Sequence, residues 1–268
     1  MMQTALFSAR NIIKTFHSDR NGEPFTALDR VNLDIAESRC LMIAGSNGSG
    51  KTLLMQIIAG LAEPDSGDIL FRGKSLFGAG SAREKRETEN AVRRELGFIF
   101  QNADAQIVGE TVAEDAAFGP ENLGYKTDEV NARINTVLDS MGLSGKRDTP
   151  ARRLSGGEKR RLAVAGVLAM GCNTIIMDEP FANLDWQGIV RTLGIISDLK
   201  NQGKTLIILT HELEKALALA DRLVILHKGR ICDDGPAADV LDRLNPEWGV
   251  RDPRRNYVDV KDCSWLEN

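Results

Sequence analysis

A glycine-rich loop of eight residues constrains this chain more than any other feature of its sequence. Residues 45–52 read GSNGSGKT, which matches the spacing G-x-x-x-x-G-K-[ST]. The run CLMIA before the loop is typical of a buried strand, and TLLMQIIAGL after it has helical spacing. Glycines let such a loop curl until its backbone N–H groups point at phosphate oxygens, and the helix start adds partial positive charge. The loop therefore predicts a phosphate site.

The last two residues of the loop have separate roles in this interpretation. Lys51 can reach the β- and γ-phosphates of ATP, and the Thr52 hydroxyl can ligate Mg²⁺. We expect every residue of the loop to contact the nucleotide: Gly45, Ser46, Asn47, Gly48, Ser49, Gly50, Lys51 and Thr52.

A second motif, TIIMDEP at residues 174–180, supplies two carboxylates at the end of an apolar strand. Asp178 at the strand tip would hold the Mg²⁺ shell. Glu179 would lie beside the γ-phosphate, where a carboxylate can orient and deprotonate an attacking water. The two motifs together predict ATP hydrolysis.

Composition limits the alternatives. The chain has 268 residues, 42% of them apolar, and a net charge of −4, so no positive field draws it to nucleic acid. The four cysteines, Cys40, Cys172, Cys232 and Cys263, lack zinc-ligand spacing and suit a reducing cytosol. We expect no signal peptide, and the most apolar stretch, residues 162–177, is shorter than a bilayer span.

The pattern along the chain predicts an α/β fold. The runs TIIMDEP and TLIILTH are short, apolar and β-branched, as in a parallel sheet buried on both faces. Residues 81–95 are highly charged and predict a solvated helix face, and residues 111–143 read as mostly helical with a break at Gly119-Pro120. LVILHKGRI predicts a final hairpin.

Residues 154–158 read LSGGE and lie between the two phosphate motifs. With those motifs, the chain resembles the ATP-binding cassette (ABC) ATPases, whose signature sequence is LSGGE. The resemblance implies that Ser155, Gly156 and Gly157 contact the ATP of a second cassette. It further implies family roles for four more residues: Gln101 in the Q-loop as a catalytic and Mg²⁺ residue, Asp185 in the D-loop as a nucleotide contact, His211 as the switch histidine and Phe16 as the aromatic that stacks on adenine.

The same resemblance implies an architecture. It comprises a RecA-like P-loop NTPase core with a mostly parallel sheet, an N-terminal antiparallel β subdomain and an α-helical signature subdomain at about residues 102–165. We expect the ABC ATPase domain to span residues 1–236, followed by a C-terminal extension, residues 237–268, without an assigned role. Two cassettes of this family dimerise head to tail, and the sequence leaves open a homodimer or a heterodimer.

The segment NADAQIVGETVAEDAAFGPENLG after Gln101 resembles the cassettes of energy-coupling factor (ECF) transporters and their cobalt/nickel relatives. That resemblance implies an ATPase at the cytoplasmic face of the cell membrane, bound to a separate transmembrane ECF-type subunit. A substrate-binding membrane subunit would select the solute, a vitamin or a transition metal ion such as cobalt or nickel. Nucleic acid is not among the expected partners.

Two other classes remain as alternatives. Soluble ABC ATPases that act on nucleic acid or ribosomes tend to carry coiled-coil insertions, zinc modules or fused cassettes, none of which the sequence contains. A nucleotide-binding regulator without turnover would not need Lys51, Asp178, Glu179 and His211 together. The D-loop FANLDWQG departs from the family, because Asn183 and Trp186 stand where Gly and Pro are frequent, which leaves its local geometry open.

Overall fold

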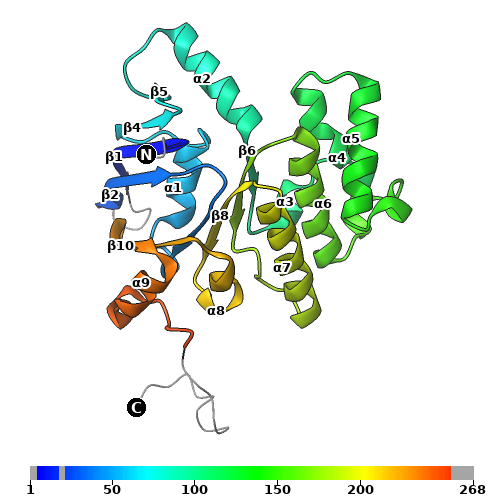
Figure 1. Cartoon of the computed structure of the whole chain (residues 1–268). Helices are drawn as coiled ribbons and strands as arrows, with labels where there is room; N and C mark the ends of the chain where they lie inside the picture. Colours follow the sequence, from blue (N-terminus) through cyan, green and yellow to red (C-terminus); the bar gives the residue numbers. More distant parts are fainter. Residues whose placement is uncertain (1–4, 18–21, 255–268) are drawn as a thin grey trace, which may run out of the picture.

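In a computed structural model of the chain, residues 5–17 and 22–254 are described. The elements fall into two sheets and a set of helices (Figure 1). The strands are β1 (Phe7–His17), β2 (Pro24–Ile35), β3 (Cys40–Ala44), β4 (Ser66–Phe71), β5 (Lys74–Ser75), β6 (Leu96–Ile99), β7 (Thr174–Asp178), β8 (Thr205–Thr210), β9 (Arg222–His227) and β10 (Arg230–Pro236). The α-helices are α1 (Lys51–Ile58), α2 (Ala82–Glu95), α3 (Ala103–Gln106), α4 (Val112–Asn122), α5 (Thr127–Ser140), α6 (Gly156–Met170), α7 (Trp186–Asn201), α8 (Leu213–Ala216) and α9 (Ala237–Asp242). Short 3₁₀ turns lie at Ser144–Lys146, Ala151–Arg153, Leu217–Leu219 and Pro246–Trp248.

The larger sheet has six strands in the order β10-β9-β3-β8-β7-β6. Strands β6, β7, β8, β3 and β9 run parallel, and β10 returns antiparallel to β9 as the predicted hairpin. The smaller sheet has the order β2-β1-β4-β5, and all of its pairs are antiparallel. These two sheets confirm the predicted α/β fold with a mostly parallel core and an N-terminal antiparallel part.

Both faces of the parallel sheet are buried, which explains why its strands are uninterrupted apolar runs. Along β3, Cys40, Met42 and Ala44 point into one core cluster, whereas Leu41 and Ile43 point into the other. The first cluster is shared with α4 to α7, and the second with α1 and the antiparallel sheet. Helix α1 therefore lies between the two sheets, and α3 to α6 gather on the opposite side of the parallel sheet (Figure 1).

The helical region differs from the prediction at one point. Pro120 does not end its helix, because α4 continues to Asn122 and the Leu123 N–H still donates to the carbonyl of Gly119 (3.1 Å). The chain turns two residues later at Gly124, whose φ is +79°. A proline in the last turn removes one backbone donor, and this helix tolerates that loss.

The segment after Pro236 packs against β9 and β10 through α9, and against β9 through the 3₁₀ turn at Pro246–Trp248. Helix α9 buries Val240 and Leu241, and Arg243 forms an ion pair with Asp233 (2.9 Å). Residues 255–268 of the expected extension lie outside the described residues, and the boundary at residue 236 stays a prediction. No helix among the described residues combines the length and the apolar character of a membrane span.

Candidate nucleotide-binding site

The predicted phosphate loop connects the end of β3 to the start of α1, as the sequence indicates. Gly50 lies at the helix N-terminus with φ +101°, a conformation that few residues other than glycine adopt. A side chain on Gly45 would lie 2.1 Å from the Leu226 carbonyl oxygen, so that close approach requires glycine. Ser49 is 2% exposed, and its hydroxyl has no hydrogen-bond partner among the residues that the structure describes. An oxygen-rich ligand in the loop would satisfy that buried hydroxyl.

The Lys51 ammonium lies inside the curve of the loop. It donates to the carbonyls of Gly45 (2.7 Å) and Ser46 (3.2 Å), and it lies 3.9 Å from Glu179 Oε1. Burial lowers the pKa of Lys51, while the neighbouring Glu179 and Asp178 carboxylates act in the opposite direction. A bound phosphate would compete with neutral carbonyls for this cation, which favours the anion.

Thr52 and Asp178 meet at the tip of β7. The Thr52 hydroxyl donates to Asp178 Oδ2 (2.8 Å), and Asp178 is 5% exposed. Burial raises the pKa of Asp178, which the Thr52 hydrogen bond partly counteracts. Gln101, which follows β6, lines the same pocket. These oxygen atoms match the preference of Mg²⁺, which takes few protein ligands and shares phosphate oxygens.

Glu179 and His211 meet because β7 and β8 are parallel neighbours whose carboxyl ends share one edge. His211 Nδ1 lies 2.9 Å from Glu179 Oε1, and the Glu179 N–H donates to the Leu209 carbonyl (2.9 Å). Glu179 adopts φ +44°, a left-handed conformation that costs energy for a residue with a side chain. The backbone therefore holds this carboxylate in a fixed position, 6% exposed, beside Lys51.

Two aromatic rings stand at the far end of the pocket. Phe16 is 41% exposed and its ring centroid lies 5.9 Å from that of Phe25, which is 53% exposed. Both line the pocket that contains the phosphate loop, a cavity of about 400 Å³. Two exposed rings beside a phosphate site suit a flat nucleobase. Phe25 was not among the predicted residues; the signal for it is the β1–β2 pairing, in which Phe16 lies opposite Phe25.

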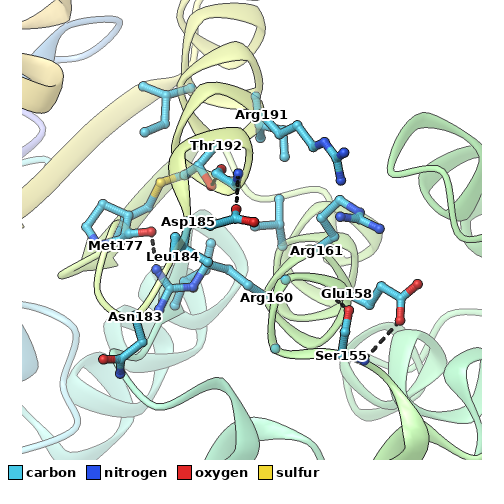
Figure 2. Close-up of a pocket in the computed structure, with 18 of the residues that line it drawn as sticks. Ser155, Glu158, Arg160, Arg161, Met177, Asn183, Leu184, Asp185, Arg191 and Thr192 are labelled. Atoms are coloured by element: carbon cyan, nitrogen blue, oxygen red, sulfur yellow. Dashed lines mark hydrogen bonds between the residues drawn. The ribbon is translucent and has the colours of Figure 1, made fainter.

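The remaining predicted residues lie elsewhere. Ser155, Gly156, Gly157 and Asp185 line a separate cavity of about 410 Å³ between α6 and α7 (Figure 2). Among the described residues, only Asp178 lines both cavities. The structure thus brings the phosphate loop, Gln101, Asp178, Glu179 and His211 together, and it leaves the signature residues apart from them.

The N-termini of α6 and α7 are capped by predicted site residues. The Ser155 hydroxyl accepts from the Glu158 N–H, and the Glu158 carboxylate accepts from the Ser155 N–H (2.9 Å), a reciprocal capping box. Asp185 accepts from the Gly188 N–H (2.7 Å) at the start of α7. Both contacts fix the loops that precede the helices, and Figure 2 shows both caps at the edge of the cavity.

Comparison with known proteins shows to which family the chain belongs. The family model described as ABC transporter matches residues 28–182. A putative ABC transporter ATP-binding protein of Halobacterium salinarum is 40% identical over 248 residues, which cover 92% of this chain and 100% of that protein. The cobalt import ATP-binding protein CbiO of Rhodobacter capsulatus is 39% identical over 229 residues, 85% of this chain and 80% of that protein.

A third relative is longer than this chain. The energy-coupling factor transporter ATP-binding protein EcfA2 of Methanospirillum hungatei is 39% identical over 209 residues, 78% of this chain and 51% of that protein. Among solved structures, cbiO1 of Clostridium perfringens, described as part of the ABC transporter complex cbiONQ, superposes with a TM-score of 0.75 at 29% identity. The alignment covers 89% of this chain and 91% of that chain. On its motifs, its fold and these matches, the chain belongs to the ABC transporter family, as one of its ATP-binding, ATP-hydrolysing cassettes.

Proposed function

We propose that this chain is the ATP-hydrolysing subunit of an ECF-type importer, which it drives from the cytoplasmic face of the cell membrane. One observation supports a dimer: the predicted nucleotide contacts are divided between two cavities of the chain. One cavity contains the phosphate loop (the phosphate-loop cavity), and the other is lined by Ser155, Gly156 and Gly157 (the signature cavity). Among the described residues, the two cavities have only Asp178 in common. A γ-phosphate in the first cavity therefore needs a second cassette to supply Ser155, Gly156 and Gly157.

Within one cassette, the chain's own residues would divide the work as follows. Backbone N–H groups of the loop and Lys51 would hold the phosphates. Glu179 would orient the attacking water and accept its proton, because its carboxylate is buried and held beside Lys51. His211, 2.9 Å from Glu179 Oε1, would fix the direction of that carboxylate.

Mg²⁺ fits the oxygen atoms of Thr52, Asp178 and Gln101 at the same edge of the cavity. When bound, the ion would neutralise phosphate charge. The Thr52–Asp178 hydrogen bond aligns the two residues before the ion arrives, so the protein part of its shell is already oriented.

The dimer would close and open with the state of the nucleotide. Ser155 presents the N-terminus of α6, a helix of 15 residues, as an anion site. Contact between this helix start and a γ-phosphate across the interface would favour the closed dimer, and hydrolysis would remove the contact. The monomer alone is then a poor ATPase.

The transport part of the proposal rests on the segment after Gln101 and on the printed names of the relatives. The cobalt import and energy-coupling factor proteins are both about 39% identical to this chain. We infer a transmembrane ECF-type partner, a membrane subunit that selects the solute, and a vitamin or a transition metal ion such as cobalt or nickel as that solute.

The decisive experiment is to purify the tagged full-length chain from native membranes and to identify its stoichiometric partners. An ECF-type transmembrane subunit together with a small substrate-binding membrane subunit is the expected result. A conventional permease pair with an extracytoplasmic binding protein would reassign the chain to an ordinary importer. Ribosomes or nucleic acid as the sole partners would refute a transport role.

A further inference from the structure

Arg160 occupies the first turns of α6, five residues after Ser155. It is half-buried and lines the signature cavity. Figure 2 shows its side chain crossing from α6 towards the segment that carries Met177 and Asn183. Arg160 was not among the predicted site residues, because RRLSGGEKRR contains several cations and nothing local distinguishes the one that turns inward.

The guanidinium of Arg160 donates to three backbone carbonyls. Its Nη2 donates to the Gln101 carbonyl (3.2 Å), and its Nη1 donates to the carbonyls of Glu179 (3.3 Å) and Pro180. None of these acceptors is a carboxylate, and burial lowers the pKa of Arg160. A planar guanidinium presents its donors in a fixed geometry, so it can connect two chain segments in one orientation.

The acceptors belong to the residues that matter for hydrolysis. Gln101 and Glu179 both line the phosphate-loop cavity, while their carbonyls accept from Arg160 on α6. Arg160 therefore connects the signature helix, α6, to the backbone of Gln101 and Glu179 from the side of the signature cavity. The connection passes between two cavities that otherwise share only Asp178 among the described residues.

The Glu179 backbone is strained, so hydrogen bonds that hold it in place matter more than they do elsewhere. Its φ of +44° is unfavourable for a residue with a side chain. The N–H of Glu179 donates to the Leu209 carbonyl (2.9 Å), and its carbonyl accepts from the Ala182 N–H (3.1 Å) and from Arg160 Nη1 (3.3 Å). Without Arg160 the Glu179 carbonyl keeps only the Ala182 N–H as a donor, so the peptide that follows Glu179 is less constrained and the carboxylate can turn away from the water that it must orient.

The segment around Gln101 is held from the other side as well. The Gln106 side chain donates to the Phe98 carbonyl (3.0 Å) and accepts from the Phe100 N–H (3.0 Å). Lys159, next to Arg160, forms an ion pair with Asp104. These contacts keep α3 and the Q-loop close to α6, so that Arg160 acts on a segment that is already confined.

We propose that Arg160 is a positioning residue that couples the orientation of the signature helix to the placement of Gln101 and Glu179. When a second cassette's nucleotide moves α6, the three hydrogen bonds transmit that movement to the carboxylate and to the Q-loop. Contact across the dimer interface is thereby linked to the geometry of the cassette's own catalytic residues. This inference rests on the proposed ATP hydrolysis.

The test compares the full-length wild-type chain with R160Q and R160K, and with R153Q as the matched control. Arg153 is an exposed cation on the preceding 3₁₀ turn. We expect kcat for ATP to fall about 10- to 100-fold in R160Q, because a displacement of about 1 Å is enough for such a loss. The KM for ATP should stay within about threefold, since the phosphate loop is untouched.

The R160K variant distinguishes an effect of the shape of the Arg160 side chain from an effect of its charge. A lysine retains the positive charge but has no planar fork with which to bridge three carbonyls. We therefore expect R160K to lose nearly as much kcat as R160Q, and R153Q to stay within about twofold of wild type. Full activity in R160K, or an unchanged kcat in R160Q, would overturn the proposal. A KM that rises in proportion to the loss of kcat would also overturn it, because that result indicates damage to nucleotide binding.

A double-mutant cycle with Glu179 provides the second readout. If Arg160 acts by placing the Glu179 carboxylate, R160Q should reduce single-turnover hydrolysis by less than about threefold in an E179Q background. An undiminished loss in that background would refute the coupling. A wild-type chain without any ATP turnover would instead refute the proposed function, so the two failures are distinguishable.

Discussion

Replacing Glu179 with glutamine tests the assignment of the general base. Glutamine has nearly the same shape, so the left-handed backbone at residue 179 and the contact with Arg160 should survive. It cannot accept a proton from water. General-base contributions are typically 10² to 10⁴ in rate, so we expect kcat to fall by that factor, which corresponds to about 2.7 to 5.4 kcal/mol at 1.36 kcal/mol per decade.

ATP binding should survive the same change. Glu179 Oε1 lies 3.9 Å from the Lys51 ammonium and 2.9 Å from His211 Nδ1, inside a cavity that must accept a polyanion. Removing a buried negative charge from that position reduces repulsion with the γ-phosphate, so the affinity for ATP should stay equal or rise. Since hydrolysis would open the dimer, E179Q should accumulate as an ATP-bound dimer.

The assay measures steady-state phosphate release, ATP affinity by calorimetry, and mass in solution with and without ATP. E212Q serves as the control, because Glu212 follows His211 in the chain and pairs with Lys215 (2.6 Å) rather than lining the nucleotide cavity. Its kcat should remain within about twofold of wild type. Wild-type turnover in E179Q would refute the base assignment, and loss of ATP binding would refute the electrostatic argument.

Three further predictions follow from single contacts. T52V removes the hydroxyl that bonds Asp178, so the Mg²⁺ concentration for half-maximal ATPase activity should rise about tenfold, and an unchanged Mg²⁺ dependence would exclude Thr52 as a ligand. A Cβ on Gly249, whose φ is +70°, would lie 3.1 Å from Ser46 Cβ, so G249V should raise the KM for ATP a few-fold. G203V is the control, because Gly203 is equally left-handed (φ +76°) but has open space around it. This variant should lose a similar amount of stability, about 1–2 kcal/mol, and its KM for ATP should stay unchanged. The Lys146 and Ser155 hydrogen bonds lower the pKa of Glu158 to about 2 from 4.5, so this carboxylate should stabilise the fold above pH 4.5 and lose that effect as the pH falls towards 2. Chemical unfolding of wild type and E158Q should show a difference in free energy at pH 5 that shrinks with acidification.

The parallel strands were predictable because their signal is local. CLMIA, TIIMD and TLIILT coincide with β3, β7 and β8, since strands buried on both faces need apolar residues at every position. The position of Asp178 at the tip of β7 has the same local signal, because the apolar run ends at this residue. The strand order β10-β9-β3-β8-β7-β6 has no such local signal and was not predicted; the family resemblance implied only a mostly parallel sheet.

Other features depend on contacts between distant residues, which a local pattern does not contain. Arg160 bonds carbonyls 19, 20 and 59 residues away, so nothing near it indicates its direction. The role of the segment after Pro236 was equally hidden. Gly249 approaches Ser46 of the phosphate loop across some two hundred residues of chain, and only the fold reveals that contact.

The D-loop around Asp185 shows that a change of residue type can leave the backbone conformation as it is. Asn183 has φ +59°, a left-handed conformation that glycine adopts without cost and that asparagine adopts more readily than other residues with a side chain. Trp186 is the first residue of α7, where proline is often favoured, and Asp185 still caps the helix through Gly188. Both departures therefore preserve the path of the loop. What changes is the surface beside Asp185, because the Trp186 side chain is 77% exposed and offers a large ring where proline would offer little. The departure thus alters the chemistry of the face predicted to meet a second cassette, while the geometry of the loop is retained.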